Sequence, residues 1–467
     1  MVQDPDERVQ FQLACTLGQL QGEPSFRVLR QIAFRHISNK WFKLAVLTAA
    51  AEDATRWFRA LTSSGGLAGQ PSKGAEELLA QLTSILGARQ KDREIAGVLA
   101  RVEKSRSQQD AWWQSASLAG LAEGLRRGPE RRVKLPTGQP LLVRLMRARS
   151  PEIENAALRV LTQIDLAVSP ELRAMLARAA TMAIYPEARL EERTRAIGIL
   201  GLDPTASTLS LLEKCLSPQQ PQEVQVATVS ALANLRIPEV TAVLLHHWRT
   251  YTGPVREATL SAFFNDRSRL LALLDAIKTD KVQPWSLTRA MKLQLLRSPD
   301  REIKEKAKVL LETSAESDRK AVFQKYQSAL QLSGNSKRGQ QIFEEICNKC
   351  HKIGNQGYEV GPDLLSVLSR PKSQLMTDIL MPNLNVENGY EEYLAQTADG
   401  SLITGVIAKQ SPTAVTLRRA KGEEDTILRS SLTNLRSLSL SAMPEDLDKS
   451  ISIEGMADLL AYLKSLR

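Results

Sequence analysis

The chain has 467 residues, of which 43% are hydrophobic and 24% charged, a composition typical of soluble globular proteins with two to four domains. No apolar run approaches the roughly 18 residues of a membrane-spanning helix, so the sequence predicts no transmembrane segment. The net charge of +10 is uneven, because residues 331–467 carry 15 Lys and Arg against 17 Asp and Glu, which leaves +12 on the preceding part. These basic residues alternate with Glu and accompany no nucleic-acid motif, so we expect a solvated charged surface and no nucleic-acid partner.

From residue 4 to about 325 the chain predicts short amphipathic helices, with apolar residues at i, i+3, i+4 and i+7. The pattern of 9–17 recurs later in the chain, and each copy is followed by a turn and a second apolar helix. The copies are 153–161, 192–200, 224–232 and 255–263, and they start 39, 32 and 31 residues apart. This resembles degenerate HEAT repeats, and the resemblance implies an α-solenoid over residues 1–325.

The period is lost between Gly65 and Leu141, where Gly, Ser, Gln and basic pairs are frequent. We expect irregular repeats and one or two mobile loops there. The two cysteines of the array, Cys15 and Cys215, lie on apolar helical patterns and are interpreted as core residues. His246 and His247 are adjacent, and neighbouring helical residues point about 100° apart, so they do not predict a metal site.

A C-x-x-C-H motif follows the array, at Cys347, Cys350 and His351. Two thiols at this spacing lie on one face of a helical turn and can bond the two vinyl groups of one porphyrin, with the histidine under the iron. A zinc site is the first alternative, but the remaining Cys and His residues are far away in helical sequence. A thioredoxin-like motif is the second, but neither the strand before it nor the βαβ context is visible. The motif therefore favours a covalently attached haem c.

The segments around this motif predict a mainly helical domain at 331–467. The helix at 333–347 carries Gly339 and Phe343 on one face, and the last helix, 453–466, offers an apolar stripe as its partner. Short β-favouring runs separated by hairpin signals predict a β-meander inserted at about 390–436. These runs are 390–397, 401–409, 414–419 and 426–430.

The series G-x-x-x-F-x-x-x-C-x-x-C-H, followed by Gly-Pro-Asp-Leu at 361–364, resembles class I cytochromes c. The resemblance implies that the carbonyl of Pro362 accepts the N–H of the His351 imidazole and orients it. It also implies a methionine as the sixth ligand of the iron. The order Ser-x-Met-Pro, a few polar residues and a final helix favours Met443. Met381, also followed by proline, is the rival, and an open sixth site is the third alternative.

Helical repeats, a cytochrome c with the inserted hairpin 397–405, and a late Ser-x-Met-Pro resemble the haem-binding C-terminal region of large exported planctomycete and verrucomicrobial proteins. Those proteins often add an N-terminal β-propeller, similar to sugar dehydrogenases, and a signal peptide. Attachment of haem c takes place outside the cytoplasm, so we expect a periplasmic or otherwise exported protein. Residues 1–6 are polar and acidic and do not form a signal peptide. We therefore expect that the natural start differs or that the chain is the tail of a longer protein; otherwise the haem assignment is wrong.

The favoured function is an electron-transfer module in which His351 and Met443 ligate a haem bound to Cys347 and Cys350, and the solenoid docks a redox partner. The second hypothesis is the electron-accepting part of a larger dehydrogenase. The third is a sensory or structural haem module, which an open sixth site would favour. The sequence contains no acid–base pair, nucleophile or phosphate loop, so it predicts no enzyme activity for this chain by itself.

Overall fold

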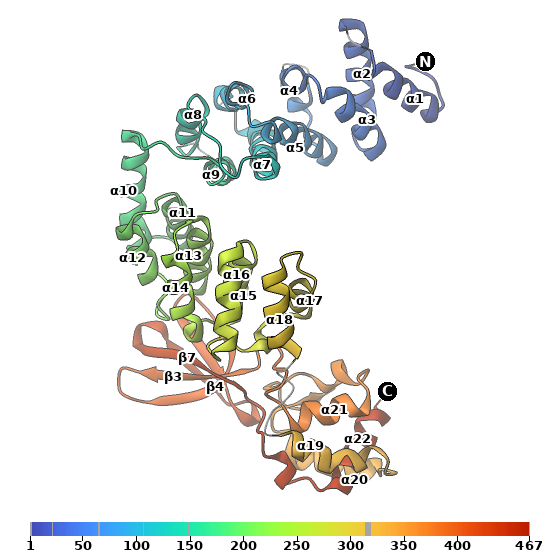
Figure 1. Ribbon diagram of the computed structural model, residues 1–467, viewed down its shortest axis with the longest axis vertical. Coiled ribbons are helices and arrows are strands. Elements are labelled where there is room, and N and C mark those ends of the chain that lie inside the picture. Colours follow the sequence, from blue (N-terminus) through green and yellow to red (C-terminus); the bar gives the residue numbers. More distant parts are fainter. Residues whose placement is uncertain are drawn as a thin grey trace. The chain divides into compact units, whose positions relative to one another are not determined.

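The computed structural model describes residues 2–20, 22–63, 66–105, 107–147, 150–312 and 319–466. The chain divides into two compact units, Met1–Thr181 and Met182–Arg467. The fold is mainly helical with a small sheet region, as predicted (Figure 1). The second unit contains the later helices of the predicted solenoid together with the whole segment that resembles a cytochrome. None of the described helices is long and apolar enough to cross a membrane.

The first unit stacks alternate helices. One row runs α1, α3, α5, α7 and α9, and a second runs α4, α6 and α8, with each helix packed on the next of its row. Such stacking buries the open face of each helix pair on its neighbours. The elements are α1 (Glu7–Leu17), α2 (Glu23–Arg35), α3 (Lys40–Ala50), α4 (Ala54–Leu61), α5 (Lys73–Ala88), α6 (Asp92–Lys104), α7 (Ala111–Arg127), α8 (Gly138–Leu145) and α9 (Pro151–Leu161), and α10 (Pro170–Ile184) spans the division.

The expectation of irregular repeats between residues 65 and 141 is wrong, because α5, α6 and α7 are regular helices that include the longest of the unit. Small residues replace large apolar ones where α5 and α7 meet. A Cβ atom on Gly120 or Gly124 would lie 2.1 Å from a backbone oxygen of α5. The apolar period fades here because the two backbones approach too closely for larger side chains, not because the helices end.

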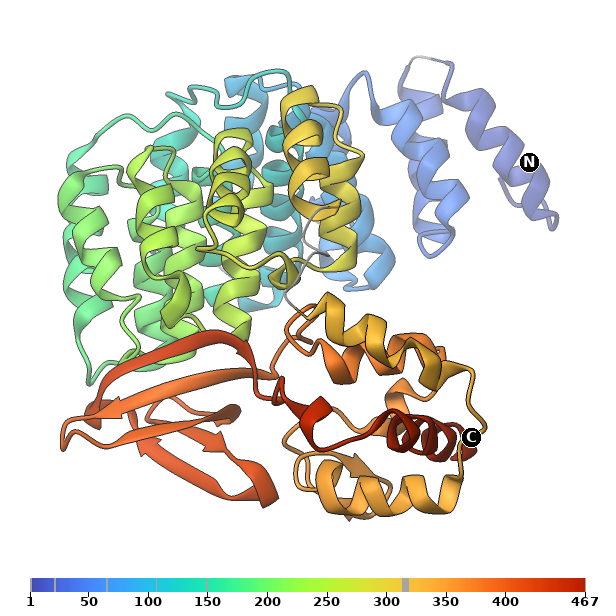
Figure 2. The same ribbon diagram turned by 60° about the horizontal axis from the view of Figure 1, so that its bottom comes forward.

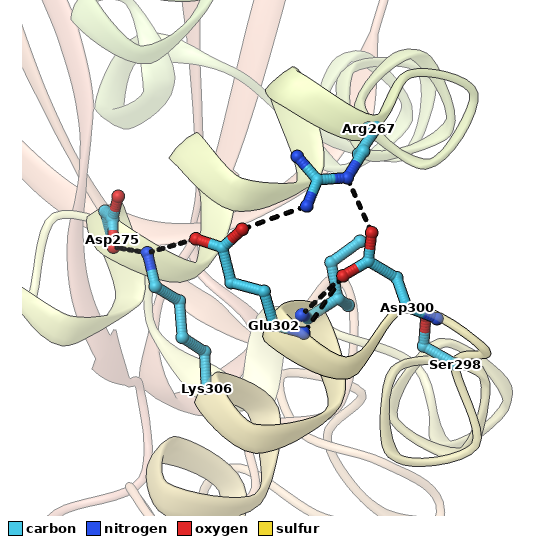
Figure 3. Close-up of polar contacts among 7 residues, drawn as sticks. Arg267, Asp275, Ser298, Asp300, Glu302 and Lys306 are labelled. Atoms are coloured by element: carbon cyan, nitrogen blue, oxygen red, sulfur yellow. Dashed lines mark hydrogen bonds and ion pairs between the residues drawn. The ribbon is translucent and has the colours of Figure 1, made fainter.

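The array continues in the second unit in the same way. Helices α11, α13 and α15 form one row, and α14, α16 and α18 form the other. Exposed ion pairs join α16 to the start of α18, where Arg267 contacts Asp300 and Glu302, and Lys306 contacts Asp275 (Figure 3). The elements are α11 (Leu190–Leu200), α12 (Ala206–Lys214), α13 (Gln222–Asn234), α14 (Glu239–His246), α15 (Gly253–Phe264), α16 (Arg267–Lys278), α17 (Arg289–Leu296) and α18 (Arg301–Glu312).

The inserted sheet has five antiparallel strands in the order β6-β5-β4-β3-β7. The four predicted β runs correspond to β3 to β6, and the fifth strand, β7, extends the insertion beyond the expected end at 436. The strands are β3 (Glu391–Thr397), β4 (Leu402–Gln410), β5 (Ala414–Arg418), β6 (Glu424–Leu428) and β7 (Leu432–Ser441). A separate small hairpin, β1 (Lys352–Ile353) with β2 (Gln356–Gly357), follows the C-x-x-C-H motif.

The sheet contacts the helical array through buried polar groups. Arg256 of α15 pairs with Glu391 of β3, and both side chains are about 5% exposed. The Ser437 hydroxyl donates to the same carboxylate at 3.0 Å, and the Tyr393 hydroxyl donates to the carbonyl of Tyr251 at 2.9 Å. Within the second unit, Figure 2 shows the sheet against the helices of the array on one side and beside the last helices on the other. The insertion therefore joins the array to the C-terminal helices.

Four helices enclose the C-terminal core: α19 (Lys320–Tyr326), α20 (Ser336–Ile342), α21 (Lys372–Leu380) and α22 (Ile453–Ser465). The predicted pairing of the motif's helix with the last helix is present, because α20 crosses α22. Helix α19 precedes the expected start of this domain at 331, but it belongs to the same core. The Tyr326 hydroxyl donates to the carbonyl of Ile451 at 2.6 Å, and the Arg319 guanidinium donates to the carbonyl of Leu380.

Candidate functional site

The C-x-x-C-H motif lies at the end of the helix that begins with α20. A short π-helix, Phe343–Cys347, ends at the first cysteine of the motif. The amides of Cys350 and His351 both donate to the carbonyl of Cys347, at 3.1 and 2.9 Å. This places both thiols and the imidazole within little more than one turn. Both cysteines are free and partly buried. Burial raises the pKa of the Cys347 thiol to about 12 and also raises that of Cys350, so both are protonated at neutral pH in the absence of a bonding partner.

The imidazole of His351 is oriented by the backbone. Its Nδ1 lies 2.9 Å from the carbonyl oxygen of Pro362, which can only accept, so Nδ1 carries the proton and Nε2 is the nitrogen left to bind a metal. Burial lowers the pKa of His351, which favours the neutral form that metal ligation needs. Gly361 packs on the ring, where a Cβ would lie 2.5 Å from Cε1. Gly357 (φ +86°) turns against the carbonyl of His351.

A cavity of about 470 Å³ opens beside this imidazole. Its size lies within the range of about 300–1,000 Å³ typical of cofactor sites. The lining is largely apolar and comes from the motif, α21, the loop after α21, the end of β7 and α22. The residues that bear on the predicted site are Cys347, His351, Pro362, Met381, Met443, Leu459 and Leu463. Cys350 is not part of the lining.

Met443 reaches the cavity on a loop that follows β7. The Met443 amide donates to the Ser441 hydroxyl at 3.1 Å, and the Ser441 amide donates to the side-chain oxygen of Asn383 at 2.7 Å. Ser441 also pairs with Glu391 across the β3–β7 ladder. Although 92 residues separate Met443 from His351 in sequence, both line one cavity.

Met381 lines the same cavity at the start of the loop after α21. It is the C-cap residue of α21, and its amide donates to the carbonyl of Thr377 at 2.8 Å. Its side chain packs against the apolar core that includes Leu380 and Met376. Met443 does not belong to that core cluster. Both rival methionines are therefore near the imidazole, but only Met381 has a second role in packing.

The residues present fit a covalently bound haem. The cavity is largely apolar and lined in part by α22, one of the two free thiols of the motif lines it, and its lining offers an imidazole nitrogen without a proton and two thioethers. Imidazole and thioether are the axial donors typical of c-type haem iron. Among the described residues, no group of three or more His, Cys, Asp or Glu side chains is placed to hold a metal ion.

The structure brings together Cys347, His351, Pro362 and Met443, with Cys350 in the adjoining turn. The sequence analysis did not identify Asn383, whose side chain connects the loop after α21 to the Met443 loop. It also missed the buried pair of Arg256 and Glu391. Neither feature carries a sequence signal, because single polar residues in helices and loops are usually solvated.

No family model and no curated protein matches the chain. Similar solved structures include two engineered proteins, with TM-scores of 0.23 and 0.25 and identities of 16% and 17%. They cover 67% and 56% of this chain and 96% and 95% of their own. A third is human deoxyhypusine hydroxylase in complex with glycerol, at a TM-score of 0.21 and 17% identity, covering 66% of this chain and 97% of that one. Similarities this weak carry no argument about the fold or the function of this chain.

Proposed function

We propose that this chain binds one haem c covalently through Cys347 and Cys350 and acts as an electron-transfer module. The observation that carries the proposal is that Cys347, the oriented imidazole of His351 and Met443 line one and the same apolar cavity. When bound, the haem supplies an iron that alternates between ferric and ferrous states. The resemblance to class I cytochromes c points to the same cofactor.

Each protein group has a distinct part in this proposal. The carbonyl of Pro362 accepts from Nδ1 of His351, which leaves Nε2 to bind the iron. Leu459 and Leu463 of α22 line the cavity with aliphatic carbon, which excludes water and lowers the local dielectric. A thioether opposite an imidazole favours the ferrous state and raises the reduction potential, which suits an electron carrier.

Met443 is the proposed sixth ligand. Its loop is anchored at Ser441 while its side chain stays outside the apolar core cluster, so the thioether can serve a ligand without loss of packing. The side chain of Met381 already contributes to the packing of that core. Replacement of Met443 should therefore change the iron's ligation, whereas replacement of Met381 should mainly change stability.

The helical array serves in this proposal as a scaffold that docks a redox partner, such as a dehydrogenase. The buried contacts of Arg256 with Glu391 and of Tyr393 with Tyr251 support this, because they attach the array to the sheet that ends in the Met443 loop. Because haem c is attached outside the cytoplasm, the proposal also implies an exported, for example periplasmic, protein.

The test is expression of the chain with a signal peptide in cells that have a cytochrome c maturation system. We expect haem that resists extraction with acidified acetone, and loss of this resistance in a Cys347→Ala, Cys350→Ala double variant. Haem that can be extracted from the unaltered protein would refute thioether attachment.

A second measurement addresses the axial ligand. Met443→Ala should remove the thioether–iron charge-transfer band of the ferric spectrum and open the ferrous protein to carbon monoxide, while Met381→Ala should retain the band. The reverse outcome would assign the sixth ligand to Met381. Ready binding of carbon monoxide by the unaltered protein would favour a sensory module over an electron carrier.

A further inference from the structure

We infer that Asn383 is a positioning residue that holds the Met443 thioether in the cavity by connecting two of the cavity's walls. This inference rests on the proposed function, because it concerns the sixth ligand of the proposed haem. Asn383 itself is not among the residues that line the cavity. It would act through the loop that carries the ligand.

The first wall is the end of α21 and the segment after it. Met381 caps α21, and both Met381 and Pro382 line the cavity. The next residue, Asn383, does not line the cavity, and its side chain contacts Ser441 at the end of β7. Its position is defined by the helix, because the amides of Met381 and Leu384 donate to the carbonyls of Thr377 and Met381 at 2.8 and 3.0 Å.

The second wall is the end of β7 and the Met443 loop. The side-chain oxygen of Asn383 accepts from the amide of Ser441 at 2.7 Å. Its side-chain nitrogen donates to the carboxylate of Glu445 at 2.5 Å. One amide side chain thus contacts the ligand loop two residues before and two residues after Met443.

Other contacts of residues 441–443 come from the sheet and from within the loop. On the sheet side, Ser441 pairs with Glu391, and the Ala442 amide donates to the carbonyl of Tyr390 at 3.2 Å. Inside the loop, the Met443 amide donates to the hydroxyl of Ser441. The contacts of Asn383 come from the opposite wall, so together they fix the distance between α21 and the ligand loop.

This arrangement has a consequence for ligation. A methionine ligand competes with water and small molecules only while its loop stays closed, since a ligand held in a minor conformation binds with reduced apparent affinity. Loss of one well-made hydrogen bond shifts such an equilibrium by roughly five- to tenfold. The sheet contacts remain in an Asn383 variant, so the fold should persist while the loop opens more often.

The test uses the full-length, haem-loaded chain. Asn383→Ala should raise the rate of carbon monoxide binding to the ferrous protein by roughly five- to tenfold, weaken the ferric charge-transfer band and lower the reduction potential. Hydrogen exchange at the Ser441 amide should accelerate to a similar degree, a readout that does not depend on redox activity.

Three further variants separate positioning from general destabilisation. Asn383→Asp retains the acceptor for the Ser441 amide but places a carboxylate beside Glu445, so it is combined with Glu445→Gln, whose amide can donate to it; this double variant should keep most of the band. Glu445→Ala removes only the exposed contact and should have a smaller effect than Asn383→Ala. Asn388→Ala, an exposed asparagine of the same connecting segment that is not among the cavity's lining residues, should leave the spectrum, the potential and the exchange unchanged.

The inference is overturned if Asn383→Ala behaves like Asn388→Ala in ligand binding, potential and exchange while Met443→Ala abolishes the band. If instead Met443→Ala retains the band, the ligand assignment fails, and the inference built on it is overturned as well. If Asn383→Ala does not fold, the Asn383→Asp, Glu445→Gln double variant and Glu445→Ala still decide. Both retain the acceptor for the Ser441 amide, so a loss of the band in both that is as large as in Met443→Ala would overturn the role given to the Ser441 contact.

Discussion

Two helix crossings in this chain are built in the same way, with glycine at the contact, but they have different surroundings. In the first unit, α7 lies against α5 at Gly120 and Gly124; in the second, α20 lies against α22 at Gly339. A Cβ on any of these glycines would come within about 2.1 Å of a backbone oxygen of the partner helix. Each crossing therefore depends on the absence of a side chain.

The surroundings of the two crossings differ. Around α5 and α7 the contact is continued by buried leucines, among them Leu79, Leu82 and Leu121. Around α20 and α22 it includes the carboxylate of Asp458, and two other residues of α22, Leu459 and Leu463, line the cavity. Close helix contact thus says nothing about function by itself. What lies on the far side of the helix decides whether a packing change reaches a site.

The largest effect should come from Phe343→Ala at the α20–α22 crossing. Phe343 is fully buried, and its ring centroid lies 5.7 Å from that of Tyr462. Removing it leaves a cavity and should destabilise this core by about 3–5 kcal/mol. Denaturant unfolding followed by haem absorbance measures the loss. Phe343→Leu, which keeps most of the volume, should lose much less, and equal losses would mean that this core is loosely packed.

Gly339→Ala should have the next largest effect, about 2–3 kcal/mol, since the added methyl group would meet the carbonyl of Asp458 and the Cβ of Tyr462. Displacement of α22 should also shift the haem absorbance, because this helix lines the cavity. Gly455→Ala on α22 is the matched control, because its Cβ would meet only side chains. An unchanged stability in Gly339→Ala would show that the two helices separate at little cost.

Gly120→Ala should cost a similar amount, about 2–3 kcal/mol, because the added methyl group would meet the carbonyl of Ala80 and the hydroxyl of Thr83 as closely. The loss should appear in far-ultraviolet circular dichroism and leave the haem spectrum unchanged. Gly97→Ala on α6, where the new methyl group meets nothing within 4 Å, should instead be neutral or slightly stabilising. A haem shift in Gly120→Ala would contradict the distinction between the two crossings.

These crossings also show how far the sequence predicts the fold. The role of Gly339 was predicted because Phe343 and the C-x-x-C-H motif follow it at fixed spacing. Gly120 and Gly124 lacked such a marker, and their region was expected to be irregular. A glycine that permits close contact and a glycine that ends a helix look the same in one sequence. Only the partner helix distinguishes them.

Strand β7 was missed for a related reason. Its alternation of Leu and Ser is inverted in part, because Ser437 is fully buried while Leu440 is 45% exposed. The buried serine donates to Glu391, which in turn pairs with Arg256. Polar residues that are buried in a network contradict the rule that apolar positions face the core. The network itself joins segments more than a hundred residues apart and leaves no local signal.

The candidate site likewise combines residues that have a local sequence signal with residues that have none. Cys347, Cys350 and His351 lie within five residues, so a local motif predicts them together, and the resemblance to class I cytochromes c adds Pro362 eleven residues later. Met443 was predicted only by resemblance, and the structure places it in the same cavity as the rival Met381. Asn383 acts across 58 residues through a single amide, and nothing in its neighbourhood distinguishes it from a solvated loop residue.

The smallest effect should be the pH dependence contributed by Asp458 at the α20–α22 crossing. Its carboxylate accepts from the Arg338 guanidinium at 2.6 and 3.1 Å and from the Asn335 amide at 2.5 Å. The Arg338 hydrogen bonds, followed by the Asn335 amide, lower the pKa of Asp458 below its ordinary value of 3.8 despite desolvation. Because the folded-state pKa is the lower one, the stabilisation is complete above about pH 4 and is lost as the pH falls through the folded-state pKa.

Asp458→Asn should therefore lower the thermal midpoint of the C-terminal core at pH 7 by less than Gly339→Ala does, since Arg338 is largely exposed and its charge is screened. The difference between variant and unaltered protein should shrink as the pH falls from about 4 through the folded-state pKa, below which the carboxyl of the unaltered protein is also neutral. Asp446→Asn, in an exposed ion pair with Lys449, provides the matched change of charge and should change the thermal midpoint at pH 7 little. A difference that stays constant from pH 7 to pH 3 would mean that Asp458 stabilises the crossing through shape rather than charge.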